Sequence, residues 1–592
     1  MAAAAPAPSA PPATPAHARA PRASRAAACA LALLAAAAFV NAVRGEFLYD
    51  DIHYVVDNPQ VQRPTARRLL LEPLSGRAEL GLYRPLPLAS WAWQAAGRGK
   101  EAPTAPFHLF NIACHVGVSL LVWRLGRALG FGSGAAWLGA ALFAVHPCHV
   151  EPVDWIVGRA ELLAALFGLG FLVVALGTGT ARRRRDVLLA AGLLTLAGLS
   201  KESAFALPFV LITIELALGR TAGGAIGLVR RHWPWAVVLA GLALLRVAAL
   251  SDFAPAGGGP PELRFGPDAK LAPFADVPWL VRPLVSAQLL GAYFLRALVP
   301  MAPRIFFHQC EFEEFSAVGV AGIVACAAAL VAARRRPPLR AALLAFPVSL
   351  ATVLNLRPIQ ETFAERFLYL PSAFVLLVAA APLAALVARE RERTGRAGRT
   401  LLAPAGAILA LLGATWAWNP VFDGALPLWR HNVARAPELP FPHYQLAYFL
   451  HDHGIFLRRD ADTPGAIEEY EAALGRNQEI LERGYEGMPP DQLIRSYLAL
   501  GSIWLDKLPE GRRDPRRARP FLEQAINLGV QKHGLDVELG QAYGLYALLR
   551  HHPGAGVTDE QAREALESAL RLDLRPESLE AIRAELERIR RR

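Results

Sequence analysis

Two adjacent carboxylates, Asp50 and Asp51, follow the first apolar run of the chain in the segment Phe47-Leu-Tyr-Asp-Asp-Ile. Carboxylates beside a membrane helix are costly unless water or a partner stabilises them. One of the two could take the proton from a hydroxyl acceptor and so act as a general base. They could instead be ordinary loop residues that cap a helix. The residues alone leave open both the role and the choice between Asp50 and Asp51.

A second polar segment, His146-Pro-Cys-His149-Val-Glu151-Pro-Val-Asp, follows a later apolar run. Its prolines stop a helix from continuing, so the segment is predicted to turn at the membrane surface. The two histidines and Glu151 could hold a metal, or they could bind a phosphate through hydrogen bonds. The histidines could also cap a helix and pair with Glu151. The spacing supplies no fourth ligand, so a divalent metal is not favoured, and we expect no required cofactor.

Further ionisable or hydrogen-bonding side chains stand near the ends of apolar runs. They are Arg84, His108, Arg159, Glu161, Lys201, Glu202, Glu365, Arg366 and Tyr369. Such side chains often only reach to the membrane interface or form plain ion pairs. Arginine and lysine are also the residues that a phosphate group needs. If all of them lie on one face of the membrane, they would line a polar cavity that opens to the outer leaflet.

The composition predicts the elements that must position these residues. The chain has 592 residues, of which 54% are hydrophobic and only 19% charged, which is typical of a membrane protein. Apolar runs predict about eleven membrane-spanning helices. They lie near 27–43, 108–125, 133–146, 160–178, 186–200, 203–219, 233–250, 316–333, 340–355, 366–388 and 400–418. We expect segment 284–300 to be a re-entrant or interfacial helix, because a further crossing there would invert every later loop.

The net charge of +11 is concentrated in short arginine clusters between the apolar runs, which argues against a nucleic-acid surface. Such clusters hold loops on the cytoplasmic side of a membrane. With a cytoplasmic N-terminus, all the clusters fall inside, and the loops that carry Asp50, His146 and Lys201 fall outside. The C-terminus is then also outside. The clusters are Arg124 and Arg127, Arg182–Arg185, Arg220–Arg231, Arg334–Arg340, and Arg389–Arg399.

The predicted fold class is all-α, in three regions. Residues 1–25, rich in alanine and proline, are expected to form a disordered cytoplasmic tail, and residues 26–419 to form the membrane domain. Residues 420–592 are more highly charged, with apolar residues three and four positions apart, which predicts paired helices outside the cytoplasm. About three degenerate copies of a tetratricopeptide-like pattern are recognisable. Their apolar positions are Tyr444, Ala447, Tyr448, Leu450, Ala466, Tyr470, Ala473 and Leu474; Tyr497, Leu500, Gly501, Trp504, Ala518, Phe521, Leu522, Ala525 and Ile526; and Ala542, Tyr543, Tyr546, Ala562, Leu566, Ala569 and Leu570.

The five cysteines are scattered and include no CxxC pair, which argues against a zinc ribbon or a redox motif. Only Cys148 and Cys310 are expected on the outer face. At most one disulfide is therefore predicted.

Taken in order, the motifs resemble those of the transmembrane and tetratricopeptide-repeat-containing O-mannosyltransferases and their bacterial relatives. The matching segments are Tyr49-Asp50-Asp51, Tyr83-Arg84-Pro-Leu, Phe107-His108-Leu-Phe-Asn111, His146-Pro-Cys-His149-Val-Glu151, Gly158-Arg159-Ala-Glu161, Ser200-Lys201-Glu202-Ser, and Glu365-Arg366-Phe-Leu-Tyr369. These enzymes belong to the multi-spanning GT-C glycosyltransferases, which use polyprenyl-phosphate sugars. The sequence departs from the family at Phe367, where an aliphatic residue is usual.

The resemblance implies an inverting transfer of a monosaccharide, with mannose favoured, from a polyprenyl-phosphate donor to a hydroxyl acceptor. Asp50 or Asp51 would be the base, and the outer-face basic and histidine residues would bind the lipid phosphate. The repeat domain would present a protein acceptor. The bias toward Ala, Arg and Gly favours a bacterial inner membrane. A transporter or flippase for a lipid-linked substrate, or an inactive membrane anchor for the repeats, is the alternative function.

Overall fold

The computed structural model describes residues 22–76, 81–177, 183–221, 224–251, 279–302, 317–356, 363–396, 398–435, 513–530, 536–572 and 576–591, with a few isolated residues between these ranges. The chain divides into two compact units, Met1–Phe422 and Asp423–Arg592, here called the membrane unit and the C-terminal unit. Every regular element in the described residues is helical. Residues 1–21, which include most of the predicted disordered tail, lie outside the described residues, as does Cys310.

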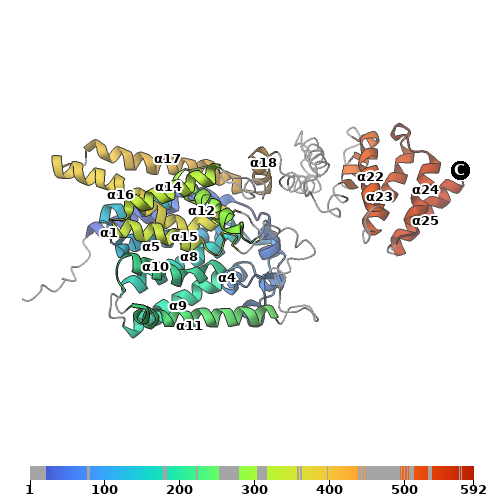
Figure 1. Cartoon of the computed structure of the whole chain (residues 1–592). Helices are drawn as coiled ribbons and strands as arrows, with labels where there is room; N and C mark the ends of the chain where they lie inside the picture. Colours follow the sequence, from blue (N-terminus) through green and yellow to red (C-terminus); the bar gives the residue numbers. More distant parts are fainter. Residues whose placement is uncertain are drawn as a thin grey trace, which may run out of the picture. The chain divides into compact units, whose positions relative to one another are not determined.

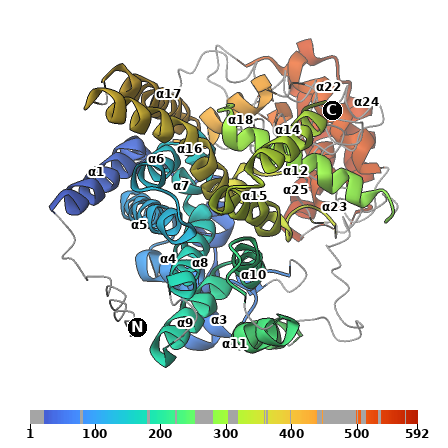
Figure 2. The ribbon, with the colours of Figure 1, turned by 60° about the vertical axis from the view of Figure 1, so that its left-hand side comes forward.

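The membrane unit is built around four helices that pack against one another, α5, α6, α8 and α16, and the remaining helices surround them (Figures 1 and 2). The described α-helices of this unit are α1 (Arg22–Ala38), α2 (Pro59–Gln62), α3 (Ala66–Leu70), α4 (Pro85–Ala95), α5 (Ala105–Leu129), α6 (Ser133–Ala144), α7 (Val150–Asp154), α8 (Arg159–Gly177), α9 (Arg184–Ser200), α10 (Leu207–Ala217), α11 (Gly224–Ser251), α12 (Arg282–Leu298), α14 (Ala317–Ala333), α15 (Pro337–Leu350), α16 (Tyr369–Thr394) and α17 (Leu402–Trp418).

Proline and glycine set several of these helix boundaries. Pro106 stands in the first turn of α5, where the missing N–H costs nothing. The same helix ends at Gly130, which has a φ of 97°. Glycine adopts this left-handed backbone conformation with less steric strain than other residues. α6 ends before the His146-Pro147 pair, because proline cannot continue a helix. The polar segments identified in the sequence therefore lie at helix ends.

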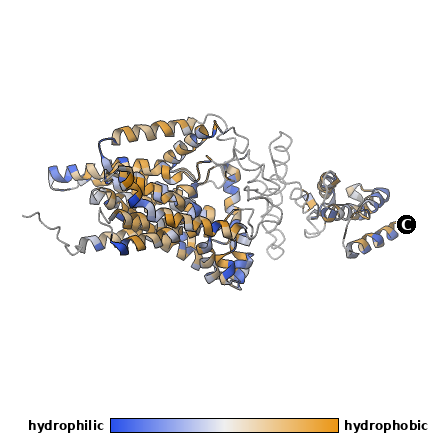
Figure 3. Ribbon diagram, turned by 60° about the horizontal axis from the view of Figure 1, so that its bottom comes forward, coloured by the Kyte–Doolittle hydropathy of each residue, from blue (hydrophilic) through white to orange (hydrophobic). Residues whose placement is uncertain are grey.

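Five helical segments of the described chain are long and apolar enough, by length and composition, to cross a membrane. They are Ala105–Leu129, Ile156–Gly177, Gly224–Ser251, Glu365–Thr394 and Gly398–Phe422. Four shorter apolar helices accompany them. Large apolar side chains on α11 and α17, such as Leu244 and Leu409, are exposed, as a lipid-facing surface requires. Figure 3 shows that hydrophobic residues dominate the helices of the membrane unit. The chain is thus an integral membrane protein with a helical fold.

The structure does not confirm the predicted number of about eleven crossings. α6 has 12 residues and α10 has 11, so each is only about 17–18 Å long at about 1.5 Å per residue. The hydrocarbon core of a bilayer is about 30 Å thick. Segment 203–219, predicted as one span, is divided by the short 3-10 helix η8 (Glu202–Ala206) before α10 begins. The number of crossings and the orientation of the termini stay predictions.

Arginines at the ends of the bundle have a structural role that the charge pattern did not reveal. An Arg340 N–H group donates to the carbonyl of Ala217 at the end of α10, at 2.5 Å, and Arg220 donates to the carbonyl of Ala128 near the end of α5, at 3.1 Å. Unpaired carbonyls at a helix C-terminus favour such cations. Arg231, expected in a loop, lies inside α11 and pairs with the fully buried Glu215 of α10.

Helices α12 and α14 touch through their backbones. A Cβ atom added to Gly291 would lie 2.0 Å from the carbonyl oxygen of Gly319, and one added to Gly322 would lie 2.0 Å from that of Gly291. Small residues permit such close approach between membrane helices. The contact fixes α12, the segment expected to be interfacial, against its neighbour.

Changing Gly291 to alanine is expected to lower the stability of the folded protein by about 1–3 kcal/mol, because the new methyl group cannot fit without moving a helix. Gly241→Ala in α11 is the matched control, since a Cβ atom there meets nothing within 4 Å. Thermal unfolding of the purified protein in detergent measures both. Equal midpoints for the two variants would contradict the close packing of α12 and α14.

The C-terminal unit contains α18 (Ala425–Arg435), α22 (Pro515–Val530), α23 (Asp536–Leu548), α24 (Asp559–Ala569) and α25 (Pro576–Arg590), of which the last four pack successively. Ala562, Leu566 and Ala569, all predicted as apolar positions of the third repeat, lie in one buried cluster. Leu522 of the second repeat packs against Gly501. Most of the first predicted repeat lies outside the described residues, so the repeat fold stays a prediction.

Candidate functional site

The loop after α1 is held by Asp51. Its two carboxylate oxygens accept the backbone N–H groups of Leu48, at 3.1 Å, and Val157, at 2.9 Å, and the side chain is fully buried. Burial raises the pKa of Asp51 well above its ordinary value, although both hydrogen bonds act in the opposite direction. Asp51 therefore joins the loop to the residues that precede α8, and its fully buried oxygens both bind backbone N–H groups.

Asp50 differs from its neighbour in exposure. Its side chain is half-buried, and it follows Tyr49, which has a φ of 44°. A left-handed backbone at a residue other than glycine costs free energy and is often found at functional sites. The ring of Tyr49 packs against that of Trp155, with centroids 6.1 Å apart. Of the two predicted base candidates, Asp50 is thus the one a substrate could reach.

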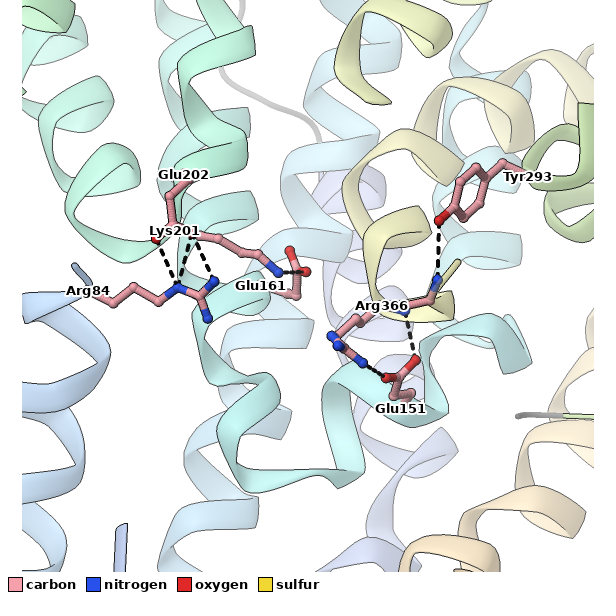
Figure 4. A network of polar contacts seen from close by, with 8 residues as sticks. Arg84, Glu151, Glu161, Lys201, Glu202, Tyr293 and Arg366 are labelled. Carbon is pink, nitrogen blue, oxygen red and sulfur yellow. Dashed lines mark hydrogen bonds and ion pairs between the residues drawn. The ribbon is translucent and has the colours of Figure 1, made fainter. Parts of the chain in front are cut away.

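The Lys201-Glu202 dipeptide, between α9 and α10, makes two separate ion pairs. Lys201 Nζ binds a carboxylate oxygen of Glu161 in the first turn of α8. Glu202 accepts hydrogen bonds from Arg84, at 2.9 Å for the shortest, and from Arg246 of α11, also at 2.9 Å. The Arg84 and Lys201 pairs lie side by side in Figure 4. The dipeptide therefore ties the connection between α9 and α10 to α8, to α11 and to the residue that precedes α4.

The Glu365-Arg366 dipeptide opens the short helix η10 (Glu365–Leu368) and repeats the same arrangement. Arg366 binds both oxygens of Glu151, one through its guanidinium group and the other through its backbone N–H at 2.9 Å. Glu365 is paired with Arg296 of α12, whose Nε lies 2.7 Å from its oxygen. In each dipeptide, the basic residue binds a carboxylate of α7 or α8, and the acidic residue binds an arginine of a more peripheral helix.

Charge pairing controls the ionisation of the groups between the helices. Burial alone would raise the pKa of Glu202, but Arg84 and Arg246 together lower it below its ordinary value, so Glu202 is ionised. For Lys201, burial lowers the pKa, and Glu161 opposes this effect. Arg84 and Arg366 are close enough to act on Lys201 as like charges. The basic groups therefore form one electrostatic cluster.

A small, partly open pocket lies beside this cluster. Glu161, Ser203, Ser349 and Phe367 contribute to its lining, and most of the remaining wall is apolar. A polar edge and an apolar wall together suit a ligand that has a charged head and a hydrocarbon chain.

The predicted histidines are used within the protein. His146 caps the short helix η6 (Pro147–His149) by accepting the N–H of Cys148 at 3.2 Å, as in the capping alternative. The same alternative expected Glu151 to pair with the histidines, but Glu151 binds Arg366. His149 lies 2.9 Å from both the carbonyl of Phe143 and the hydroxyl of Ser372. His108 Nε2 donates to the carbonyl of Gly45 at 3.1 Å. These contacts position the turn between α6 and α8 and the loop after α1.

No three His, Cys, Asp or Glu side chains come together as a metal site in the part of the chain that the structure describes. Cys148 is a buried free thiol, and Cys310, the other cysteine expected on the outer face, lies outside that part. Tyr369 is also turned inward, since its hydroxyl lies 2.8 Å from Nδ1 of His115.

Arg159 is a buried anchor. Its three guanidinium nitrogens donate to the side chains of Asn111 and Ser90 and to the carbonyl of Phe107, at 3.0–3.1 Å. The side chain is fully buried. Arg159 thus holds α4, α5 and α8 together, whereas Arg84, Lys201 and Arg366 form the basic cluster between the helices.

Sequence analysis missed Arg246, Arg296 and His115. Arg246 and Arg296 are lone arginines inside apolar helices, in Ala-Leu-Leu-Arg-Val-Ala and Tyr-Phe-Leu-Arg-Ala-Leu. A lone charge in an apolar helix is a signal for a functional or paired group. That signal could have identified both arginines, although it could not have identified their partners.

Replacing Arg246 with methionine is expected to lower the free energy of unfolding by about 1.5–3 kcal/mol, because Glu202 loses one of two charged hydrogen-bond donors. Arg246 also donates to the carbonyl of Gly81, so the end of α11 loses two contacts. The control is Arg230→Met in the same helix, where the side chain is exposed. Equal thermal midpoints for the two variants would contradict the role of Arg246 in holding Glu202.

Comparison with known proteins gives several relatives. The chain is 34% identical to human protein O-mannosyl-transferase TMTC4 over 162 residues, which cover 24% of this chain and 21% of that protein. It is 36% identical to mouse protein O-mannosyl-transferase TMTC1 over 140 residues, covering 22% and 15%, and 30% identical to the Caenorhabditis elegans protein O-mannosyl-transferase F38B6.6 over 145 residues, covering 23% and 21%. The match thus spans only 15–21% of the length of these relatives.

The crystal structure of the apo oligosaccharyltransferase of Archaeoglobus fulgidus is similar with a TM-score of 0.43 and 16% identity, over 75% of this chain and 59% of that one. No family model matches the chain. The resemblance inferred from the motifs is nevertheless confirmed: over 22–24% of its length, the chain is related to the protein O-mannosyl-transferases.

Proposed function

We propose that the protein is an inverting glycosyltransferase. It moves a monosaccharide, with mannose favoured, from a polyprenyl-phosphate donor to a hydroxyl acceptor at the outer face of the membrane. The observation that carries the proposal is the cluster of Arg84, Lys201 and Arg366 at helix ends, in the same unit as the half-buried carboxylate of Asp50.

Trp155 links the base to the basic cluster. Its ring packs against Tyr49, the residue before Asp50, and lies 5.5 Å from the guanidinium carbon of Arg366. Its indole N–H donates to the carbonyl of Leu48 at 3.3 Å. The loop that carries Asp50 is therefore held close to the group proposed to bind the leaving phosphate.

In the proposed reaction, Asp50 accepts the proton of the acceptor hydroxyl as that oxygen attacks the anomeric carbon. The bond from the anomeric carbon to the phosphate oxygen breaks on the opposite face, and its electron pair leaves with the polyprenyl phosphate. Lys201 and Arg366 stabilise the negative charge that develops on that phosphate. The basic residues neutralise the leaving group, so these steps require no cofactor.

The placement of the substrates follows from the same proposal. A charged lipid head requires a polar cavity, and the apolar wall of the pocket suits the adjoining hydrocarbon. The C-terminal unit would present a protein acceptor outside the cytoplasm, and the N-terminus would be cytoplasmic. We place the protein in a bacterial inner membrane, with membrane lipids as its surroundings and no nucleic-acid partner.

The test is transfer of labelled mannose by the purified full-length protein in detergent, from polyprenyl-phosphate mannose and, separately, from a nucleotide-activated mannose. Labelled glycoprotein formed from the lipid donor alone supports the proposal. Product from the nucleotide sugar alone would overturn the assignment of the donor. Absence of transfer from a range of lipid-linked sugars, together with movement of the lipid across proteoliposomes, would support the transporter alternative.

A further inference from the structure

Phe367 follows the Glu365-Arg366 dipeptide and lies between two cations. Lys201 Nζ is 4.9 Å from the centroid of its ring, and the guanidinium carbon of Arg366 is 5.3 Å from it. The ring is half-buried and forms part of the pocket wall. Figure 4 shows Lys201 and Arg366 extending toward each other from different parts of the bundle.

Both distances fall within the range of about 6 Å in which an aromatic ring attracts a cation. This attraction matters here because the two cations repel each other and are held by different carboxylates. Lys201 binds Glu161 of α8, whereas Arg366 binds Glu151 of α7. One aromatic ring therefore contacts two basic groups that are otherwise anchored separately.

We propose that Phe367 is a positioning residue, which holds the ammonium group of Lys201 and the guanidinium group of Arg366 at the distance needed to grip one phosphate group at the pocket. The inference rests on the proposed function, since it assumes a phosphate-bearing substrate. It adds a role for an apolar side chain that neither donates nor accepts a proton.

An ammonium group has three donors, of which Glu161 takes one, so the remaining donors of Lys201 can serve a phosphate. The ring leaves these donors unoccupied, whereas another carboxylate in its place would occupy them and would repel the phosphate. Phe367 thus fixes the direction of the cations without competing for their hydrogen bonds.

The ring also favours the charged form of Lys201. Glu161 acts in the same direction, whereas Arg84, Arg366 and the burial of the side chain act against the charge, and Glu202 is its neighbour in the chain. Loss of the ring should therefore lower the pKa of Lys201. The attraction between the ring and the ammonium group corresponds to a shift of roughly one unit in the pKa of Lys201.

The experiment compares full-length wild-type protein with Phe367→Leu and Phe367→Tyr, using polyprenyl-phosphate mannose as donor. Phe346→Leu is the matched control, since this buried ring of α15 packs against Phe294, with centroids 5.9 Å apart, and has no cation over it in the described chain. Donor KM, kcat and the pH profile of kcat/KM are measured for each protein.

We expect Phe367→Leu to raise the donor KM about tenfold and to move the basic limb of the profile about one unit lower. Phe367→Tyr should restore both, because it retains the ring. If Phe367→Leu and Phe346→Leu have the same pH profile and the same KM, the ring has no positioning role. An inactive wild type would instead contradict the proposed function itself.

Discussion

Replacing Asp50 with asparagine is expected to reduce sugar transfer by about 10²–10⁴-fold, the usual contribution of a general base. The amide has nearly the same shape as the carboxylate but cannot accept the proton of the acceptor hydroxyl. Asp50 is half-buried and precedes the residue that anchors the loop, so the fold should be retained. Single-turnover transfer from polyprenyl-phosphate mannose measures the loss, and thermal unfolding in detergent checks the fold.

Asp51→Asn should behave differently from Asp50→Asn. One oxygen of Asp51 would become an NH₂ group facing a backbone N–H of Leu48 or Val157. An unsatisfied buried hydrogen-bonding group costs about 1–3 kcal/mol, so this variant should lose stability first. Asp57→Asn, an exposed carboxylate of the same loop, is the control for both. Full activity of Asp50→Asn, together with loss of activity in a stable Asp51→Asn protein, would identify Asp51 as the base and Asp50 as a structural residue.

The second large effect is expected from Lys201→Met. Methionine keeps much of the length of the side chain but removes the charge that the departing phosphate needs, and loss of one such group typically costs about 10²–10³-fold in kcat. The substitution also leaves Glu161 buried without its cation. An uncompensated buried charge destabilises a protein by roughly 3–5 kcal/mol.

A double variant separates these two consequences of Lys201→Met. Lys201→Met with Glu161→Gln contains no buried unpaired charge at this position, so most of the lost stability should return. Transfer should remain as low as in the single variant, because the cation is still absent. Recovery of transfer along with stability would show that Lys201 serves the fold alone. The comparison requires kcat and the thermal midpoint of all three proteins.

The motifs in the sequence identified which groups stand at helix ends, because prolines and apolar runs define those ends locally. They did not identify the partners. Arg84 binds Glu202, which is 118 residues away, and Arg366 binds Glu151, which is 215 residues away. Such pairs depend on how distant helices cross, and this crossing leaves no local pattern in the sequence.

The sequence also could not decide between Asp50 and Asp51, because their tertiary partners are not evident from it. Both residues have the same chemistry and adjacent positions, so no pattern of residue types distinguishes them. Tertiary structure does so, because the N–H of Val157, 106 residues away, occupies an oxygen of Asp51. The spans were equally hard to predict, since hydropathy does not reveal where α10 begins or that Arg231 lies inside a helix.

The ion pairs of the two dipeptides have a consequence for ligand selection. Lys201 and Arg366 already have carboxylate counter-ions in the resting protein, so Glu161 and Glu151 partly neutralise the charge that would attract an arriving anion. A small inorganic anion has only its charge with which to bind these cations, so its affinity should be low. A lipid phosphate also brings hydrocarbon for the apolar wall of the pocket. Under the proposed function, the resting ion pairs should therefore favour a lipid-linked phosphate over inorganic phosphate.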